Sequence, residues 1–506
     1  KKISIHATEK PLGEILTGIS KIANVHFSYS SQRIPVETKV TVKANNQTIK
    51  EILDTVLKNL DIRYFVIEEQ IILKPGKRRK TSTSQIPLTK YTISGYIIDK
   101  SDGEGLIGAT IYVPELNTGT ITNPYGFYSI TLPRGQYKLV YSYIGYNNFL
   151  KPVLLDTDRF FEIALETDTS VLEEVVVISS EYDKVVEKTQ MSEIKINPQS
   201  IHYMPSLMGE VDVIKSLQSI PGITMFGDGS TLFFVRGGNK DQNLIQIDEA
   251  PIYNPSHLLG FFSTIIPDAV KEIKVYKGDM PASQGGRLSS LIDIKTKDGN
   301  LKRFGMSGSF GLVSGKISLE GPIKKDKSSF FISGRRSYFG WILKSDNSTD
   351  TDFYFYDLNA KINYRINERN RLFLSFYGGE DNYTESPVPE QSSGIRWNNV
   401  AGTLRWNHLF SNKVFSNTTL YASKYDYFLV TSREREEFWN SHIVNISLKS
   451  DVTWYHKPDN IFRSGLQFSR YNFNPGNFKF GNEPEGLRYP VVHRKKCHRN
   501  NNIHKQ

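Results

Sequence analysis

The feature that most constrains this fold is a series of long alternating segments after residue 300. Because successive side chains of a strand point to opposite faces, each segment has one apolar face and one polar face. In one segment the two faces read Ala360, Ile362, Tyr364 and Ile366 against Asn359, Lys361, Asn363 and Arg365. In another they read Val444, Ile446, Leu448, Val452 and Trp454 against Asn445, Ser447, Lys449, Asp451 and Thr453. An apolar outer face with a polar inner face is typical of a transmembrane β-barrel, whereas a soluble sandwich turns its polar face outward.

These segments are few for a barrel that encloses a domain. About nine strands fit between residues 303 and 473, whereas a barrel that holds a domain needs roughly 22, and one of about eight is filled by its own side chains. We predict a partial antiparallel transmembrane β-barrel at residues 301–480 and expect a truncated or frameshifted gene, or a fragment. Residues 481–506, which end in VVHRKKCHRNNNIHKQ, have no strand pattern and are predicted to be an irregular tail.

Composition removes several classes of function. The 506 residues allow several domains, and the single cysteine, Cys497, leaves no disulfide within the chain and no thiolate cluster. The net charge of +10 comes from scattered basic residues, so no nucleic-acid partner is predicted. The chain opens with KKISIHATEK, so a secretory leader is either absent or already removed. The histidines lack ligand spacing and no H-E-x-x-H or G-x-S-x-G motif occurs, so we predict no enzyme, metal or cofactor.

The N-terminal part contains two similar units. Residues 3–29 and 39–73 each read as strand, helix and strand, with helical spacing in PLGEILTGISKIA and TIKEILDTVLKNL. They predict a small α+β domain at residues 1–75, with one sheet and two covering helices. This segment resembles the STN domain of secretins and of signalling TonB-dependent receptors; a generic small α+β domain is the alternative. The basic, Ser- and Thr-rich residues 76–90 are predicted to be a linker.

Residues 91–168 have turn residues every eight to twelve positions and predict a small β-sandwich. The runs GEGLIGATIYV, NPYGF, LPRGQYKL and YIGY are similar to those of the carboxypeptidase regulatory-like domain, an accessory module without peptidase activity.

A short β-prone run follows in residues 169–190. Glu174, Val175, Val176, Val177 and Ile178 look like the TonB-box region of TonB-dependent receptors, where a strand adds to the sheet of the energy-transducing protein TonB. The alternative is that this run is the last strand of the preceding sandwich.

The run SQGGRLSS at residues 283–290 is not a phosphate-binding loop. It has an arginine where a P-loop requires lysine, and SSLIDIKTK continues as a strand instead of a helix. Together with DVIKSLQSI, PGI, FFVRGG and LIQIDEAPIYNPSHLLGFFS, it resembles the α+β plug domain of TonB-dependent outer-membrane receptors, which we assign to residues 191–300. The glycines then form a tight corner. Many relatives have a glycine pair where this chain has Ser289 and Ser290.

The resemblance implies two sets of site residues. Arg236 and Arg287 are candidates for pairing with barrel carboxylates, with solvated or backbone-bonded arginines as the alternative. Candidate ligand contacts in the plug loops are Phe226, Asp228, Tyr253, Asn254 and His257, and the barrel loop at 381–396 is a further candidate. For Tyr253, Asn254 and His257 the alternative role is packing.

The multidomain plan implies an outer-membrane TonB-dependent receptor with its N-terminal domains in the periplasm. Such a receptor takes up a siderophore, cobalamin or glycan, and its STN domain signals to an anti-sigma regulator. The implied partners are a TonB-type protein, that regulator, outer-membrane lipid and a small extracellular ligand. A truncated barrel would leave the product inactive. The alternatives are a secretin-like component and a surface adhesin.

Overall fold

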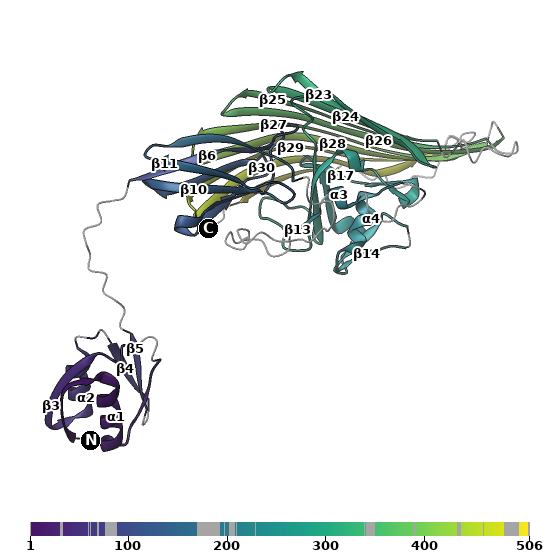
Figure 1. The fold of residues 1–506 in the computed structure, drawn as a ribbon. Helices are drawn as coiled ribbons and strands as arrows, with labels where there is room; N and C mark the ends of the chain where they lie inside the picture. Colours follow the sequence, from purple (N-terminus) through teal and green to yellow (C-terminus); the bar gives the residue numbers. More distant parts are fainter. Residues whose placement is uncertain are drawn as a thin grey trace. The chain divides into compact units, whose positions relative to one another are not determined.

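The computed structural model describes most of the chain, and the described residues are 2–30, 34–58, 60, 62–67, 70–75, 89–168, 193–196, 198–201, 208, 210–227, 229–338, 340, 350–388, 391–432, 437–458, 460–479 and 495–503. The chain divides into two compact units, Lys1–Leu88 and Thr89–Gln506. Figure 1 shows the elements of each unit. No helix among these residues is long and apolar enough to cross a membrane.

The first unit is an α+β domain, as predicted. Its elements are β1 (Lys2–Pro11), α1 (Leu12–Ala23), β2 (His26–Ser28), β3 (Lys39–Thr48), α2 (Ile49–Leu57), β4 (Ile62–Ile67) and β5 (Gln70–Pro75). A capping box between Thr48 and Glu51 starts α2, and Asn24 in a left-handed conformation ends α1. Both helices bury one apolar face in a core shared with the strands.

The prediction of a single sheet in this unit is wrong. β1 pairs antiparallel with β3, and β2, β5 and β4 form a separate sheet in which β2 runs parallel to β5. The physical reason is ladder length, because β1 and β3 each have ten residues whereas β2 has only three. The longer ladder satisfies more main-chain groups than pairing within each β-α-β unit would.

The second unit begins with the predicted β-sandwich. Its elements are β6 (Lys90–Asp99), β7 (Thr110–Val113), η1 (Pro114–Leu116), β8 (Thr118–Ile121), β9 (Phe127–Pro133), β10 (Gly135–Ser142), β11 (Phe149–Leu155) and β12 (Arg159–Leu165). One sheet has the order β11-β10-β7-β8 and the other β12-β6-β9. Apolar side chains of both sheets, including Ile97, Ile111 and Leu139, form the core between them.

The predicted plug, described from residue 193 to residue 300 with gaps, is α+β. Its helices are α3 (Pro198–Ile201), α4 (Val213–Ser216), η2 (Leu217–Ser219), η3 (Lys240–Gln242), η4 (Leu258–Gly260) and η5 (Pro267–Ala269). Its main sheet has the order β13-β20-β21-β16-β17, formed by Glu193–Ile196, Val270–Tyr276, Ser290–Thr296, Asn243–Ile247 and Ala250–Ile252. Two hairpins complete it: β14 (Ile223–Met225) with β15 (Phe233–Val235), and β18 (Ser256–His257) with β19 (Phe262–Ser263).

The glycine-rich corner leads into strand β21, as the sequence predicts, and not into a helix. Gly238 lies so close to Ser289 that an added Cβ would stand 2.5 Å from the Ser289 Cβ. Only glycine fits this close approach without a shift. Ser289 is one of the two serines that stand where many relatives have glycine. Its hydroxyl donates to the Val235 carbonyl at 2.7 Å and so links the corner to β15.

A ten-stranded antiparallel sheet, hereafter the wall, follows the plug in strict chain order. Its strands are β22 (Gly305–Phe310), β23 (Ser314–Lys324), β24 (Ser328–Ser337), β25 (Asp350–Asn367), β26 (Asn370–Val388), β27 (Gln391–Ser411), β28 (Val414–Ser432), β29 (Glu437–Lys457), β30 (Asn460–Lys479) and β31 (Lys495–Ile503). Residues 495–503 of the tail predicted to be irregular form this last strand, which corrects the prediction for that part. A ladder needs main-chain groups and no apolar pattern, so β31 pairs with β30 despite its polar sequence.

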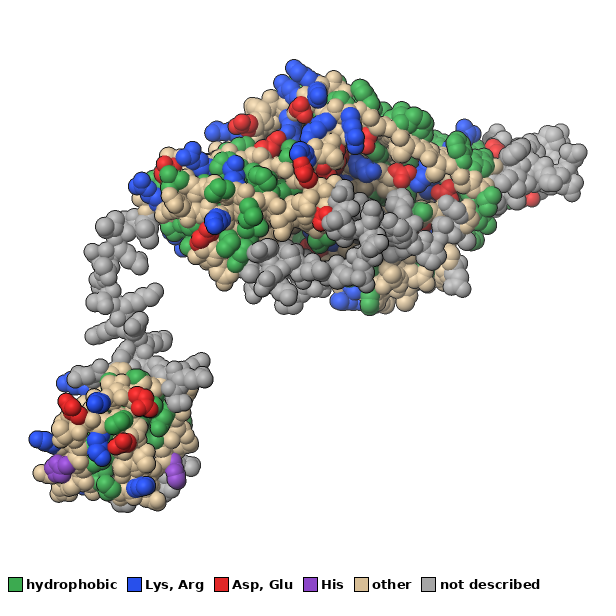
Figure 2. Space-filling view, viewed as in Figure 1, with side chains coloured by type: hydrophobic (Ala, Val, Ile, Leu, Met, Phe, Trp, Pro, Cys, Tyr) green, Lys and Arg blue, Asp and Glu red, His purple; other side chains and the backbone are tan. Residues whose placement is uncertain are grey.

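The wall is apolar outside and polar inside, as its alternation predicts. On β29, Ile446 and Leu448 are 50% and 47% exposed, whereas Asn445 and Ser447 are 0% and 1% exposed. Figure 2 shows hydrophobic side chains gathered along the large sheet. The inner face covers the plug, since Tyr377, Ala401 and Tyr421 of the wall belong to the plug's core. This is the reverse of a water-soluble sheet.

Candidate functional site

The tight turn between β16 and β17 places two carboxylates against the wall. Ile247 pairs with Ala250, so Asp248 and Glu249 form a two-residue hairpin loop. Both have positive φ, 48° and 77°, a conformation that hairpin turns usually assign to asparagine and glycine. A non-glycine residue held in this region costs on the order of 1 kcal/mol or more. The surrounding contacts therefore have to hold the turn in place.

Asp248 binds both the plug and the wall. Its carboxylate accepts from the main-chain N–H and the hydroxyl of Thr296, and Lys361 Nζ of β25 lies 3.3 Å from it. Lys361 also donates to the Thr296 carbonyl at 2.9 Å and lies 2.8 Å from Asp298. Burial alone would raise the pKa of Asp248, but Lys361, Arg405 and Lys295 outweigh it and hold the pKa below its usual range.

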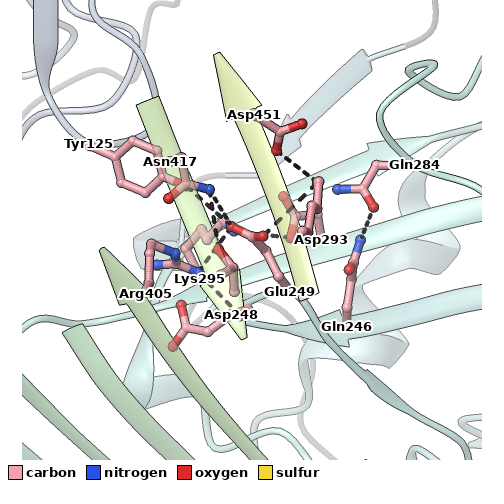
Figure 3. A network of polar contacts seen from close by, with 12 residues as sticks. Tyr125, Gln246, Asp248, Glu249, Gln284, Asp293, Lys295, Arg405, Asn417 and Asp451 are labelled. Atoms are coloured by element: carbon pink, nitrogen blue, oxygen red, sulfur yellow. Dashed lines mark hydrogen bonds and ion pairs between the residues drawn. The ribbon is translucent and has the colours of Figure 1, made fainter. Parts of the chain in front are cut away.

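Glu249 is the centre of a buried network, and Figure 3 shows the surrounding side chains converging on it. Its carboxylate is approached by Arg405 of β27 at 3.2 Å, Lys295 of β21 at 3.6 Å and Lys449 of β29 at 4.0 Å. Asn417 of β28 donates to it at 3.4 Å. Burial raises the pKa of Glu249, yet the three cations outweigh it and keep the carboxylate ionised. One plug residue is thus tied to three wall strands.

In a second buried cluster the plug contributes the cationic group and the wall contributes the carboxylates. His257 of the plug is 1% exposed, and its two ring nitrogens contact Asp357 of β25 and Asp381 of β26. Asp381 also accepts from the main-chain N–H of Leu258 at 2.9 Å. The Phe355 ring stacks on the imidazole with centroids 4.4 Å apart. His257 is therefore a buried plug-to-wall contact.

The sandwich joins the same network. Lys271 of the plug lies 3.0 Å from Glu104 of the sandwich and 2.9 Å from Asp298. Glu104 accepts from the main-chain N–H groups of Asp298 and Gly299. Tyr125, at the tip of the NPYGF turn, donates to Glu249 at 3.2 Å. A chain of alternating charges thus runs from the sandwich through the plug to the wall.

Aromatic packing fixes the sandwich on the wall near its short turns. Phe127 stacks on Phe415 of β28 with ring centroids 5.3 Å apart, and Tyr455 of β29 lies 5.9 Å from it. Ser129 donates to the main-chain carbonyl of Asn412 in the short turn between β27 and β28. The sandwich therefore covers this end of the plug and wall.

Among the described residues, the two arginines chosen from the sequence match the alternative expected for them, solvated or backbone-bonded side chains. Arg236 is exposed, and Arg287 donates to the carbonyl of its own neighbour, Gly286, at 3.1 Å. Neither forms an ion pair with a carboxylate in the described part of the chain. The ionic contacts of the plug with the wall come instead from Asp248, Glu249, His257, Asp268 and Asp298.

The candidate ligand contacts fall into two groups. Phe226 is 71% exposed, which suits a contact residue. Tyr253 and Asn254 are half-buried, and Asn399 of β27 donates to the main-chain carbonyl of Asn254 at 2.7 Å. His257 is enclosed and open to no ligand. Asp228 and the run Glu174, Val175, Val176, Val177 and Ile178 lie outside the described residues.

One feature of the sequence could have indicated the plug-to-wall ion pairs that were not predicted. Lys361 and Lys449 stand on the polar face of alternating strands, where a lysine needs a buried partner. Their acids, Asp248 and Glu249, occupy a hairpin turn, where charged residues are common and give no such signal. Among the described residues no cluster of His, Cys, Asp or Glu is arranged to hold a metal ion.

Three family models match this chain. They are the Secretin and TonB N terminus short domain at residues 25–75, the CarboxypepD_reg-like domain at 93–177, and the TonB-dependent Receptor Plug Domain at 205–289. The chain carries the domains of a TonB-dependent receptor. The CarboxypepD_reg-like match reaches residue 177 and so includes part of the Val175 run.

Curated TonB-dependent receptors match over part of their length. A TonB-dependent receptor of Formosa agariphila is 27% identical over 176 residues, which are 32% of this chain and 17% of that protein. The TonB-dependent receptor SusC of Bacteroides thetaiotaomicron is 29% identical over 228 residues, which are 42% of this chain and 21% of that protein. The matches thus span about a fifth of the length of these relatives.

Solved receptors with low sequence identity were also found. The siderophore receptor PirA of Acinetobacter baumannii is 13% identical, with a TM-score of 0.43, and the match covers 56% of this chain and 48% of that one. The ferripyoverdine receptor of the Pseudomonas aeruginosa outer membrane is 11% identical, with a TM-score of 0.42, covering 94% and 57%.

Proposed function

We propose that this chain serves energy-coupled uptake across the outer membrane, with the plug as the gate. The observation that carries the proposal is the inverted wall: its apolar face is exposed, and its polar face is buried against a plug held by Asp248, Glu249 and His257. Lipid suits the outer face. A plug held by ion pairs, and not by an apolar seam alone, is able to exchange these contacts for water when it moves.

TonB is the proposed energy-transducing partner, and residues 174–178 are its proposed binding segment. The run Glu174 to Ile178 follows the sandwich directly, and a β-branched strand adds readily to the edge of a partner's sheet. A Val176→Pro substitution removes a main-chain donor from such a strand and should weaken binding of a purified TonB C-terminal domain. A Val176→Thr control keeps the donor and the β-branch and should bind like the parent.

The proposed ligand is a small extracellular nutrient of the siderophore, cobalamin or glycan class. The exposed Phe226 lies in the plug loop 226–231, and Asp228 of the same loop is proposed to act beside it. Tyr253, half-buried at the β17 end, is a further proposed contact. The Phe226→Ala variant should lose ligand binding while its stability stays within about 0.5 kcal/mol of the parent, as expected for an exposed residue.

The N-terminal α+β domain is proposed to signal from the periplasm to an anti-sigma regulator. It is a compact unit of its own with its own core, so ligand occupancy can be passed on by a partner that binds it. Deleting residues 1–75 should abolish induction of a linked operon and leave uptake intact. Equal loss of both activities would contradict a separate signalling role.

The deciding experiment joins localisation with transport. Cells that express the chain are fractionated, and the outer-membrane fraction is tested for heat-modifiable migration. The same cells, with and without TonB, then receive radiolabelled ferric siderophores, cyanocobalamin or maltooligosaccharides. We expect a heat-modifiable outer-membrane protein and TonB-dependent accumulation of one probe class. The proposal would be refuted if the chain is found outside the outer membrane, or if the labelled probe accumulates equally with and without TonB.

A further inference from the structure

A small cationic cavity lies where the sandwich, plug and wall meet. It has a volume of about 20 Å³. Its lining contains a single carboxylate, Asp298, and six cationic side chains: Lys271, Lys295, Lys361, Arg365, Arg371 and Arg405. All three lysines have carboxylate partners outside the cavity, and the arginines differ from them in keeping unpartnered Nε atoms.

Two of these arginines face each other across a strand pair. Arg365 of β25 and Arg371 of β26 are direct cross-strand partners. Like charges directly opposite each other destabilise a sheet unless an opposite charge lies between them. The two guanidinium groups share one carboxylate, Glu162, at 3.3 and 3.4 Å, and its side chain is 40% exposed. This single exposed acid compensates the pair poorly.

Unpaired donors point to the missing charge. The Nε atoms of Arg365, Arg371 and Arg405 are buried without a hydrogen-bond partner among the described residues, as is Asn363 Oδ1. Arg371 and Arg405 are both more than nine-tenths buried. A buried polar group without a partner destabilises the folded state, and more so when it is charged. All three arginines line this cavity, so an acceptor held there would be placed to satisfy donors that otherwise carry this cost.

A monatomic anion fits this role better than water does. A water molecule brings two hydrogens that need acceptors, whereas Asn363 Oδ1 is the single unpartnered acceptor among the described side chains of the lining. A halide ion accepts from several donors and offers none. The volume allows one particle of about the size of a water molecule, and a polyatomic anion such as phosphate does not fit.

The geometry points to a binding site for one chloride-sized anion between Arg365, Arg371 and Arg405. The bound anion neutralises the cross-strand arginine pair and links the wall to the sandwich, whose Gly103 and Tyr125 also line the cavity. It is a structural anion that stabilises the three-way junction. This assignment is independent of the proposed transport function, since it rests on the cavity alone.

Bromide is the direct probe. Crystals of the full chain grown in sodium bromide should show an anomalous difference peak within hydrogen-bond reach of Arg371 Nε and Arg405 Nε. A density peak without anomalous signal at this position identifies a water molecule and overturns the assignment. An empty cavity overturns it as well.

Thermal unfolding in solution provides the second test. At constant ionic strength, replacing gluconate with chloride or bromide should raise the unfolding temperature with saturable dependence on halide concentration. Arg371→Lys keeps the charge but lacks the Nε donor, so half-saturation should move about tenfold higher, as expected for one lost charge-assisted hydrogen bond. The Arg396→Gln control, at an exposed wall arginine, should respond like the parent. If Arg371→Lys does not fold, Arg365→Lys takes its place. If the unfolding temperature of the parent protein does not change with halide concentration, the proposed site is refuted.

Discussion

Nε2 of His257 in the plug lies 2.8 Å from Oδ1 of Asp357 in wall strand β25, and the opposite ring nitrogen contacts Asp381 of β26. Burial alone would lower the pKa of His257, but the two carboxylates outweigh it and raise the pKa to about 9. At neutral pH the ring therefore carries a positive charge. It joins two neighbouring wall strands to one plug hairpin.

We expect this attachment to weaken at alkaline pH. Because the folded-state pKa lies above the ordinary value of 6.5, the stabilisation is fully present below pH 6.5 and is lost as the pH rises through about 9. The whole shift corresponds to on the order of 3 kcal/mol. Denaturant unfolding between pH 6 and 9.5 measures it. His257→Gln should be less stable at pH 6 and should lose most of this pH dependence; a variant whose pH profile overlays the parent's would show that the ring stays neutral.

The ion pair between Arg405 and Glu249 should contribute more to plug retention than either arginine chosen from the sequence. Arg405→Ala leaves the buried Glu249 with fewer cations, and breaking a buried pair in this way costs about 3–5 kcal/mol. Arg287→Ala is the matched control, because Arg287 bonds only to the Gly286 carbonyl among the described residues. Its effect should stay within about 0.5 kcal/mol. The free energy of unfolding and the rate of tryptic cleavage of the plug measure both variants, and similar losses in the two would refute this assignment.

The wall was predictable because its signal is local. A period of two places Ile446 and Leu448 on one face and Asn445 and Ser447 on the other, whatever strands lie beside them. Lys361 and Lys449 were placed inward by the same rule. The sandwich and the plug strand after the glycine corner followed from turn spacing and from the absence of a P-loop lysine.

The contacts that hold the plug were not predictable in this way. His257 meets Asp357 and Asp381, which lie 100 and 124 residues further along the chain. Nothing near His257 in sequence marks it as a buried charge. Arg236 and Arg287 illustrate the same point: residue type predicts that an arginine pairs with a carboxylate, but only the fold decides which arginine turns inward. Strand pairing in the first unit is equally non-local, so one sheet was predicted where two exist.

The sandwich should detach when its aromatic contact is removed. Phe127 is fully buried between Phe415 and Tyr455, and truncating such a ring to alanine costs about 3–5 kcal/mol. Because Phe127 faces the wall and not the sandwich's own core, Phe127→Ala should speed proteolysis at this junction while the isolated sandwich keeps its fold. Phe149→Ala, at an exposed ring on β11, is the control and should leave the cleavage rate unchanged. Equal cleavage in parent and Phe127→Ala would show that other contacts hold the sandwich.

The environment of the outer face can be tested by placing a charge on it. Leu448 on the wall and Ile22 on α1 have nearly the same exposure, 47% and 50%, so exposure alone predicts equal tolerance of arginine. If the wall faces lipid, Leu448→Arg costs about 2–4 kcal/mol near the middle of the bilayer. Ile22→Arg faces water and should change stability by about 0.5 kcal/mol or less. Heat-modifiable migration and the yield in the outer-membrane fraction compare the two variants. Loss of assembly only in Leu448→Arg supports a lipid-facing wall, whereas equal yields would mean that water covers this face.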